Sequence, residues 1–307
     1  MIVTDSLECD RKVGVWMYQN SGGPEIEQKM ILKLLERGIN SVTRLDLRFA
    51  IGTKEGIFCK GVNMNELDAF FSYNAGEQTV AQVYMYQVLS EFIPTLNNFK
   101  SFTISEDKFL TNMILVKAGV PTSDFYLCHK EDIKLLTQKF ETWQKMVYKP
   151  VDGWGGNGMA LIENHAMLDT LLPFINKSDS RNVYVERFIK NDYSDFRVDI
   201  VDGEFVACYG RKASGRDWRT NITSGGSVIM REANDEIVAL AKKATMAVGL
   251  EIAGVDILYD QEKEEYIVLE INGIPAFATP AQEAMGLDFN DKKIDLIVNM
   301  IDRITKK

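Results

Sequence analysis

Two apolar segments within residues 253–272 carry acidic and amide side chains where a buried strand would carry apolar ones. The first segment contains Asp256, and the second contains Glu270 and Asn272. Side chains two residues apart on a strand leave the same face, so Glu270 and Asn272 should point the same way. If residues 260–265 form a turn, antiparallel pairing brings Asp256 roughly opposite Glu270. The pattern predicts a hairpin with three oxygen-bearing side chains on one face.

Two unpaired carboxylates buried together would cost free energy, because like charges repel and each loses its hydration. A hard divalent cation removes this cost, and oxygen ligands favour magnesium or manganese over zinc. The chain has only two histidines, both in polar, loop-like contexts, which argues against histidine-based zinc chemistry. We therefore expect Asp256, Glu270 and Asn272 to bind magnesium or manganese.

The composition is that of a globular enzyme, with 307 residues, 46% of them hydrophobic and 26% charged. The net charge of −9 argues against general nucleic-acid binding, which relies on a basic surface. No apolar run reaches the roughly 18 residues that span a bilayer, and the first residues make a poor secretory signal. The four cysteines show no paired spacing, so reduced thiols are expected. These features predict a cytoplasmic protein that binds neither membranes nor nucleic acids.

The order of predicted elements divides the chain into three parts of mixed α/β and α+β character. Residues 12–98 alternate strands and helices, which predicts a small parallel α/β domain with ligands near the strand carboxyl ends. The next part opens with an amphipathic helix over 105–118, for which Ser105 is the expected N-cap. In the last part antiparallel strands dominate, with one helix over 235–248. The expected domains are 1–98, 99–185 and 186–307.

A glycine-rich loop joins two predicted strands, 145–149 and 159–163. Four glycines in the six positions 153–158 leave backbone N–H groups free to approach an anion. The loop lacks the Gly-Lys-Ser/Thr of a P-loop, so we interpret it as a flap over phosphates, with a ligand-free flexible hairpin loop as the alternative. Lys149 ends the preceding strand and needs an anion to offset its desolvation. Lys108 is either a second phosphate ligand or a solvated helix charge.

Taken together, these features resemble the ATP-grasp superfamily, and within it the RimK-type amino-acid ligases. The resemblance covers nearly all of residues 99–307. It rests on an ordered set of motifs: Lys-Pro with the glycine loop at 149–158, Val-Glu-Arg-Phe-Ile at 185–189, Asp-Phe-Arg at 195–197, Asp-Trp-Arg-Thr-Asn at 217–221, Gly-Val-Asp at 254–256 and Glu-Ile-Asn at 270–272. It implies an ATP-grasp fold, in which a small N-terminal α/β domain precedes two α+β subdomains that clasp ATP.

The resemblance also implies a role for each matching residue. The hinge that binds adenine would comprise Glu186, Arg187, Phe188 and Ile189, and the ribose would contact Asp195. The α- and β-phosphates would be held by Lys108 and Lys149 beneath Gly153, Gly155, Gly156 and Gly158. The γ-phosphate and the reacting carboxylate would face Arg219 and Asn221, supported by Arg197 and Arg211. One or two magnesium ions would bridge the phosphates on Asp256, Glu270 and Asn272.

The implied activity is ATP-dependent ligation of a carboxylate to an amine. The γ-phosphoryl group passes to the carboxylate, and the amine attacks the acyl phosphate. Both steps place negative charge on oxygens, so metal ions and arginines serve better than a strong base. The expected amine is an amino acid such as glutamate, and the expected acceptor is a carboxylate on a cofactor, a peptide or another small acid. A non-catalytic ATP-binding regulatory module and a kinase that stops at phosphoryl transfer stay open, and a homo-oligomer is possible.

The turn after Asn272 departs from the RimK-type pattern. Residues 273–277 read Gly-Ile-Pro-Ala-Phe, where those enzymes commonly have Ala-Ser-Pro-Gly. Asn272 and Pro275 are kept, so the departure concerns the acceptor pocket that this turn borders. The Asn-Gly-Ile-Pro sequence is similar to that of ligases that add glutamate to tetrahydromethanopterin or related cofactors.

Overall fold

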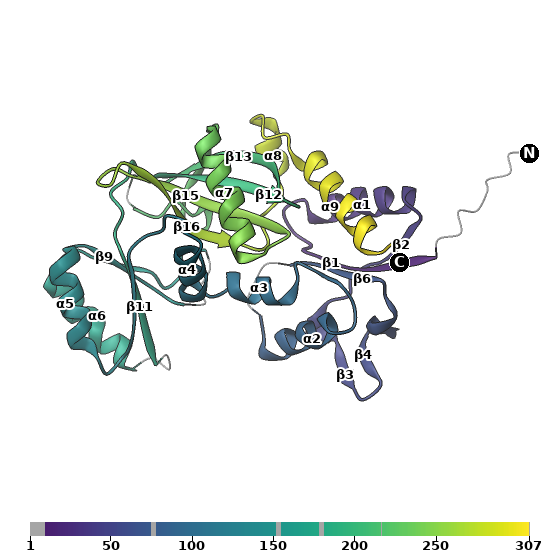
Figure 1. The fold of residues 1–307 in the computed structure, drawn as a ribbon, viewed down its shortest axis with the longest axis horizontal. Coiled ribbons are helices and arrows are strands. Elements are labelled where there is room, and N and C mark those ends of the chain that lie inside the picture. The colour runs from purple at the N-terminus through teal and green to yellow at the C-terminus, as the bar shows by residue number, and fades with distance from the viewer. Residues whose placement is uncertain (1–9, 75–77, 152–154, 178–180, 216, 307) are drawn as a thin grey trace, which may run out of the picture.

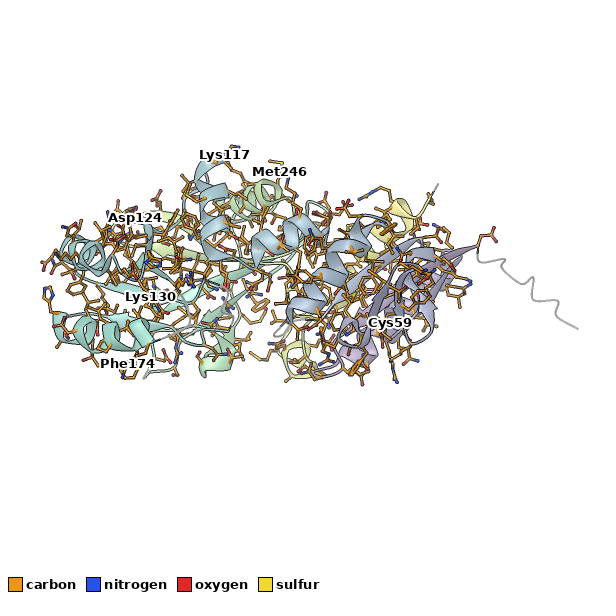
Figure 2. The ribbon with its side chains drawn as sticks, turned by 90° about the horizontal axis from the view of Figure 1, so that it is seen from below. Cys59, Lys117, Asp124, Lys130, Phe174 and Met246 are labelled. Atoms are coloured by element: carbon orange, nitrogen blue, oxygen red, sulfur yellow. The ribbon has the colours of Figure 1, made fainter. Side chains whose placement is uncertain are left out.

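The computed structural model describes residues 10–74, 78–151, 155–177, 181–215 and 217–306. The described residues form four sheets along an elongated molecule (Figure 1). Figure 2 shows this length from another side, with Cys59 in the N-terminal part and Phe174 toward the opposite end. Cys59, Cys128 and Cys208 are free thiols. Within the described ranges, no helix has both the length and the apolar character needed to cross a bilayer.

The N-terminal sheet is parallel and has the strand order β2-β1-β6-β7. Its elements are β1 (Arg11–Met17), α1 (Gly23–Glu36), β2 (Ile39–Val42), β6 (Ala69–Tyr73), α2 (Val80–Ser90) and β7 (Thr95–Leu96). Val13 and Val15 on β1 are fully buried against α1, whereas Trp16 packs with α2 residues on the other face. The two helices thus cover opposite faces of the sheet, as the sequence predicted for this part (Figure 1).

The connections of this sheet change direction at its centre. From β1 the chain passes through α1 to β2 on one side, and from β6 it passes through α2 to β7 on the other. The carboxyl ends of β1 and β6 therefore form a topological switch point, where ligands bind in open α/β sheets. A small antiparallel sheet that the sequence did not predict lies beside it, formed by β3 (Ile51–Thr53), β4 (Gly56–Cys59) and β5 (Val62–Asn63).

The middle sheet is antiparallel, with strand order β10-β9-β11-β8. Its elements are β8 (Phe125–His129), α5 (Ile133–Trp143), β9 (Met146–Lys149), β10 (Ala160–Ile162), α6 (His165–Lys177) and β11 (Asn182–Arg187). The predicted strands on either side of the glycine-rich loop are β9 and β10, and they pair with each other. The loop is thus the connection of a hairpin at the edge of this sheet.

The C-terminal sheet has the order β14-β13-β12-β15-β16. Its strands are β12 (Ser194–Val201), β13 (Glu204–Lys212), β14 (Ser227–Ile229), β15 (Ile252–Asp260) and β16 (Glu265–Asn272). In the hairpin of β15 and β16, Asp256 lies opposite Glu270 as predicted, but the strands extend to the pair Asp260 and Glu265, which we expected in the turn. A register shift between Asp256 and Ile257 was not predicted.

Of the remaining helices along the chain, α3 (Phe99–Ser105) and α4 (Lys108–Lys117) lie between the N-terminal and middle sheets, α7 (Asp235–Val248) lies between β14 and β15, and α8 (Pro280–Ala284) and α9 (Asn290–Ile304) follow β16. The bounds of α7 match the prediction, but the helix predicted over 105–118 starts later. Ser105 ends α3 and its hydroxyl donates to the Phe102 carbonyl at 2.7 Å, whereas Asp107 caps α4 by accepting from the Leu110 N–H at 2.8 Å. Lys108 is thus the first residue of α4.

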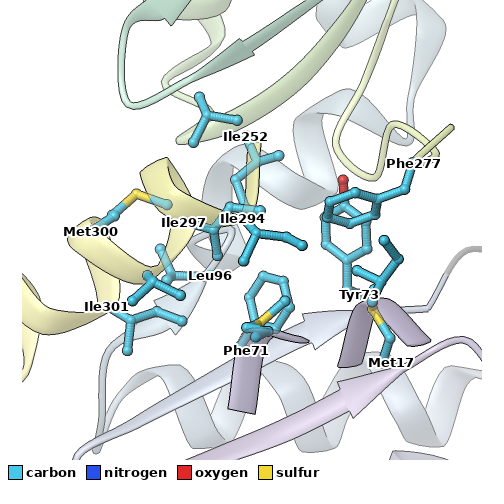
Figure 3. Close-up of a cluster of buried hydrophobic side chains, with 14 of the residues drawn as sticks. Met17, Phe71, Tyr73, Leu96, Ile252, Phe277, Ile294, Ile297, Met300 and Ile301 are labelled. Carbon is cyan, nitrogen blue, oxygen red and sulfur yellow. The ribbon is translucent and has the colours of Figure 1, made fainter. Parts of the chain in front are cut away.

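The last helix returns to the N-terminal sheet. α9 packs beside α1, and its Ile294, Ile297 and Ile301 share one buried core with β1 and β6 (Figures 1 and 3). In the same core the Tyr73 and Phe277 rings lie 5.4 Å apart. This packing fixes the turn after β16 against the carboxyl end of β6. The three larger sheets follow the order of the three expected domains, whose boundaries stay a prediction.

Candidate active site

A cleft lies between the middle and C-terminal sheets. It contains two adjoining cavities of about 70 and 40 Å³. Five residues line both cavities and make them one continuous site: Lys149, Met159, Thr220, Asn221 and Leu269. Ligand sites usually measure about 300–1,000 Å³, so this conformation of the cleft is a closed one.

The larger cavity is the more apolar of the two and borders the predicted hinge. Glu186, Arg187, Phe188 and Ile189 all line it, and Val147, Leu258 and Leu269 supply apolar surface. At its rim the Phe188 ring meets the Trp218 ring edge-on, with centroids 6.2 Å apart. Such a slot of aliphatic and aromatic groups suits a flat ring such as a nucleobase.

The Arg187 side chain has a structural role in this hinge. Its guanidinium donates to Asp124 at 2.9 Å, to the fully buried Asp260 at 2.5 Å and to Glu262 at 2.9 Å. The pairs with Asp260 and Glu262 join the end of β11 to the β15–β16 hairpin, and the pair with Asp124 joins it to the residue before β8. The side chain is thus committed to holding the two sheets together at the cleft.

The smaller cavity is polar and joins cations to the predicted metal ligands. Lys108, Lys149, Arg211, Asp256 and Glu270 line it. The Lys108 ammonium lies 3.4 Å from the Glu270 carboxylate, and its side chain is only 14% exposed. The alternative of a solvated helix charge is therefore wrong for Lys108. Three cations and two carboxylates converge where a triphosphate with its metal would need them.

Lys149 is buried and has the anion that its burial requires. Its ammonium donates to Glu186 at 2.6 Å. The Glu186 carboxylate also accepts hydrogen bonds from Ser123 at 2.8 Å and Tyr184 at 2.9 Å. Several donors thus converge on one buried carboxylate, and this contact fixes the Lys149 side chain at the wall shared by the two cavities.

Asp256 is the most strongly held of the predicted metal ligands. It is 1% exposed, and its carboxylate accepts from Arg197 at 2.5 Å and from Arg211 at 2.7 Å. Burial alone would raise the pKa of Asp256, but the charges and hydrogen bonds of Arg197 and Arg211 outweigh burial and hold this pKa below its usual range. The carboxylate is therefore ionised and ready to act as an anionic ligand.

The glycine-rich loop folds over this cleft. Gly155, Gly156 and Gly158 all have positive φ, which favours glycine, whereas Gly153 lies outside the described residues. A Cβ on Gly156 would come within 2.9 Å of the Asn221 Oδ1 atom. The Gly155 carbonyl accepts from the Thr223 hydroxyl at 2.6 Å, so the loop touches the segment that follows β13. The described part of the loop thus lies against the segment that follows β13, with a backbone conformation that favours glycine.

This arrangement has a recognisable counterpart among known proteins. The model of the RimK-like ATP-grasp domain matches residues 105–300. The chain belongs to the RimK-like ATP-grasp family. The match includes the whole cleft, from Lys108 on α4 to the β15–β16 hairpin.

Individual relatives agree with this assignment. The tetrahydromethanopterin:alpha-L-glutamate ligase of Methanocaldococcus jannaschii is 29% identical over 243 residues, which cover 78% of this chain and 81% of that protein. The glutamate–LysW ligase ArgX of Sulfolobus acidocaldarius is 23% identical over 270 residues, which cover 82% of this chain and 87% of that protein.

Solved structures show the same fold. The ATP-grasp ligase PsnB in complex with a minimal precursor aligns with a TM-score of 0.69 at 18% identity, covering 94% of this chain and 99% of that one. The D-alanine–D-alanine ligase from Bacillus anthracis aligns with a TM-score of 0.69 at 17% identity, covering 96% and 98%. At these identities the likeness concerns the fold.

Within this ATP-grasp site, the structure does not place Asp195 at the nucleotide. Asp195 is fully buried and lines neither cavity. Its carboxylate accepts from Arg211 at 2.7 Å and also from the Thr220 hydroxyl. The predicted ribose contact therefore lacks support, and Asp195 instead holds Arg211 and Thr220 in position beneath the cleft.

Three further predicted residues differ in position from the expectation. Arg219 lines only the apolar cavity, where it pairs with Asp217 at 2.7 Å and donates to the Gly156 carbonyl at 2.9 Å. Arg211, which we expected only in a supporting role, is the arginine beside the polar cavity. Asn272 lines neither cavity, although its side-chain amide lies 3.5 Å from the Gly254 carbonyl on the neighbouring strand.

The sequence reasoning missed some residues of the cleft. Thr220, Met159 and Leu269 line both cavities but were not predicted. Each is next to a predicted feature: Thr220 precedes Asn221, Met159 follows the glycine loop, and Leu269 precedes Glu270. Their apolar or hydroxyl character gave no signal by itself, but their adjacency to charged and glycine positions could have identified them.

Proposed function

We propose that this protein is an ATP-dependent ligase that joins an amino acid, such as glutamate, to a carboxylate acceptor through an acyl phosphate. Support comes from its membership of the RimK-like ATP-grasp family and from its relatives, which are named as glutamate ligases acting on tetrahydromethanopterin or LysW. The structural neighbour D-alanine–D-alanine ligase is also named as a ligase. The acceptor is a small molecule or peptide that bears a carboxylate.

The observation that carries the proposal is the pairing of Asp256 with Glu270 at the polar end of a cleft whose other end is apolar. The apolar end fits adenine against residues 186–189. The polar end presents Lys108, Lys149 and Arg211 to the phosphates. A nucleoside triphosphate laid along this cleft brings its γ-phosphate to the hairpin acids.

The residues present fit magnesium or manganese. The donor set consists of carboxylate oxygens, which hard cations prefer, and ionised Asp256 is suited to a cation. Among the described residues, no group of three or more His, Cys, Asp or Glu side chains could hold a metal alone. Magnesium commonly uses one or two carboxylates together with substrate phosphates, so Asp256, Glu270 and the nearby Asn272 would hold it only with ATP. When bound, the ion neutralises phosphate charge.

The chain's own groups supply the rest of the chemistry. Lys108 and Lys149 bind and orient the phosphate oxygens, and Arg211 stabilises the negative charge that grows as the γ-phosphoryl group moves. Asp195 fixes Arg211 in this orientation. The glycine loop excludes water from the cleft, which protects an acyl phosphate until the amine arrives.

Because the cavities are small in this conformation, ATP must open the cleft. Displacement of the glycine loop releases the Gly155 and Gly156 carbonyls from Thr223 and Arg219. In the polar cavity, Lys108 must turn from Glu270 toward the phosphates. We infer that this loop opens for ATP entry and closes again for the reaction.

A turnover assay tests the proposal. Phosphate and ADP release should be measured with Mg·ATP against a panel of carboxylates and amino acids, with Asp256→Asn and Glu270→Gln as inactive variants. Glu265→Gln, at the other end of the same strand, is the matched control and should keep full activity. Hydroxylamine supplied in place of the amine should yield a hydroxamate. Phosphorylation of a hydroxyl group, with no hydroxamate formed when hydroxylamine is added, would indicate a kinase. ATP binding without turnover would indicate a regulatory module.

A further inference from the structure

A second cavity lies in the N-terminal part, away from the ATP cleft. It measures about 290 Å³, which is more than the two cavities of the ATP cleft together. Its walls include Met17, Gln19, Arg44, Arg48, Lys60 and Asn74. This size is near the lower end of the range for small-molecule sites. We call it the Arg44 pocket.

The Arg44 pocket sits at the topological switch point of the parallel sheet. Met17 ends β1, and Asn74 directly follows β6. Arg44 and Arg48 come from the segment after β2, and Lys60 follows β4. The parallel strands β1, β2 and β6 thus contribute to the pocket from their carboxyl ends. Open α/β sheets bind ligands at this position.

The charges of the pocket favour an anion. Three cations, Arg44, Arg48 and Lys60, line it together with one carboxylate, Asp46. Arg48 pairs with Asp46 at 2.6 Å. In the described part of the chain, neither Arg44 nor Lys60 has a side-chain hydrogen bond or ion pair, although Lys60 acts electrostatically on Asp46. With three cations and one carboxylate, the pocket has a local excess of positive charge in a protein of net charge −9.

The backbone conformations of Arg44 and Lys60 and the lowered pKa of Asp46 agree with a positively charged pocket. Arg44 and Lys60 have φ values of 58° and 51°, a left-handed region that residues other than glycine rarely adopt. Burial acts to raise the pKa of Asp46, but Arg48 and Lys60 hold it below its usual range. Two residues with strained backbones thus add their positive charges to the pocket.

The pocket is also connected to the reacting end of the ATP cleft. Tyr73, next to Asn74, donates from its hydroxyl to the Pro275 carbonyl at 2.5 Å. Pro275 lies three residues after Asn272, which is at most about 10 Å of chain. The same strand end therefore borders the Arg44 pocket and supports the turn beside the metal ligands. An elongated acceptor could extend from one to the other.

We propose that the Arg44 pocket binds an anionic end of the acceptor, either several carboxylates or a phosphate ester. This inference rests on the proposed ligase function, because it assigns the pocket to the acceptor of that reaction. Arg44 and Lys60 recognise the anion, and Gln19 and Asn74 supply neutral polar contacts. An acceptor so anchored presents its reacting carboxylate toward the β15–β16 hairpin.

Calorimetric titrations at low ionic strength test the pocket without turnover. The probes are a triglutamate peptide, glycerol 3-phosphate and free L-glutamate. The wild-type protein should bind triglutamate or glycerol 3-phosphate, and the tighter of the two identifies the source of the anion. The double variant Arg44→Gln/Lys60→Gln should bind about 100-fold more weakly, because each of the two cations contributes roughly tenfold to the affinity for an anion.

A matched control separates the pocket from general charge effects. Lys54→Gln removes one cation from the neighbouring β3–β4 hairpin, where Lys54 does not line the pocket. It should leave probe affinity within twofold. An unchanged affinity for Mg·ATP in the double variant shows that its fold is intact.

Several results would overturn the inference: no binding of triglutamate or glycerol 3-phosphate by the wild type, equal binding by the double variant, an equal loss in Lys54→Gln, or preferential binding of free L-glutamate. Failure of the proposed ligase function has a different signature, namely normal probe binding without metal-dependent ADP release from any acceptor. In turnover, the double variant should raise the KM for the acceptor and leave the KM for ATP unchanged.

Discussion

Replacing Lys293 by methionine tests how the turn after the metal-binding strand is held. Lys293 on α9 is fully buried, and its ammonium donates to Asp199 at 2.8 Å, to the Pro275 carbonyl at 2.8 Å and to the Ala276 carbonyl at 3.1 Å. The Asp199 Oδ1 atom has no hydrogen-bond partner in the described structure. Methionine keeps the aliphatic stem and the volume but removes all three donated hydrogen bonds.

The loss of stability comes from the Asp199 carboxylate, which stays buried without its partner. Removing one partner of a buried ion pair costs about 3–5 kcal/mol, because the other charge stays buried and unpaired. Unfolding a chain of 307 residues at ~2.1 cal/mol/K per residue changes entropy by about 0.65 kcal/mol/K. Lys293→Met should therefore lower the melting temperature by about 5–8 °C.

Thermal and urea denaturation, followed by circular dichroism, measure this loss. The neighbouring Lys292→Met is the matched control, because Lys292 is exposed, and it should cost less than about 1 kcal/mol. Adding Asp199→Leu to Lys293→Met removes the orphaned carboxylate and should recover most of the stability. A loss below about 1 kcal/mol for Lys293→Met alone would refute this reasoning.

Two other predictions concern the loop over the cleft. Gly156→Ala places a Cβ 2.9 Å from the Asn221 Oδ1 atom at a φ of 75° and should raise the KM for ATP about tenfold in the ADP-release assay. Gly203→Ala is its control, since φ is 76° there but nothing lies within 4 Å; an equal effect on KM would rule out the clash as the cause. The hydrogen bond from Arg219 lowers the pKa of Asp217 to about 2. The stability that this carboxylate contributes is therefore present above the unfolded-state pKa of 3.8. It is lost as pH falls through about 2. Asp217→Asn should accordingly cost only about 1 kcal/mol at pH 7, because water screens this partly exposed pair. Denaturant titrations should show this cost disappearing as pH falls through about 2. A pH-independent difference would contradict the assignment.

The hairpin could be predicted from sequence because its information is local. Alternation with period two places Glu270 and Asn272 on one face, and a short polar turn sets which residue faces Asp256. The cleft's glycine loop was recognisable for the same reason. Local patterns of this kind specify a strand pair without reference to the rest of the fold.

Contacts between distant strands were not predictable in this way. Asp195 and Arg197 were both placed at the ligand, but strand order decides their partners. β12 lies between β13 and β15, so Asp195 faces Arg211 on one neighbour and Arg197 faces Asp256 on the other. Without this order, a sequence cannot show that Asp195 is satisfied beneath the cleft.

The prediction that a helix begins at residue 105 was wrong because two residues compete for the N-cap position. Ser105 and Asp107 are both good N-caps, and the sequence alone does not rank them here. In the structure Ser105 bonds backward to its own helix, whereas Asp107 caps the next one. The Arg44 pocket was missed because its cations come from segments that only the folded sheet brings together.

The central claim is that the β15–β16 hairpin holds the metal on the phosphates of ATP. Crystals grown with Mn²⁺ and a non-hydrolysable ATP analogue test it directly through anomalous scattering. The account predicts manganese within roughly 2.5 Å of carboxylate oxygens of both Asp256 and Glu270, beside the triphosphate. An analogue bound in the cleft with manganese elsewhere, and with Asp256 still paired only with Arg197 and Arg211, would contradict it.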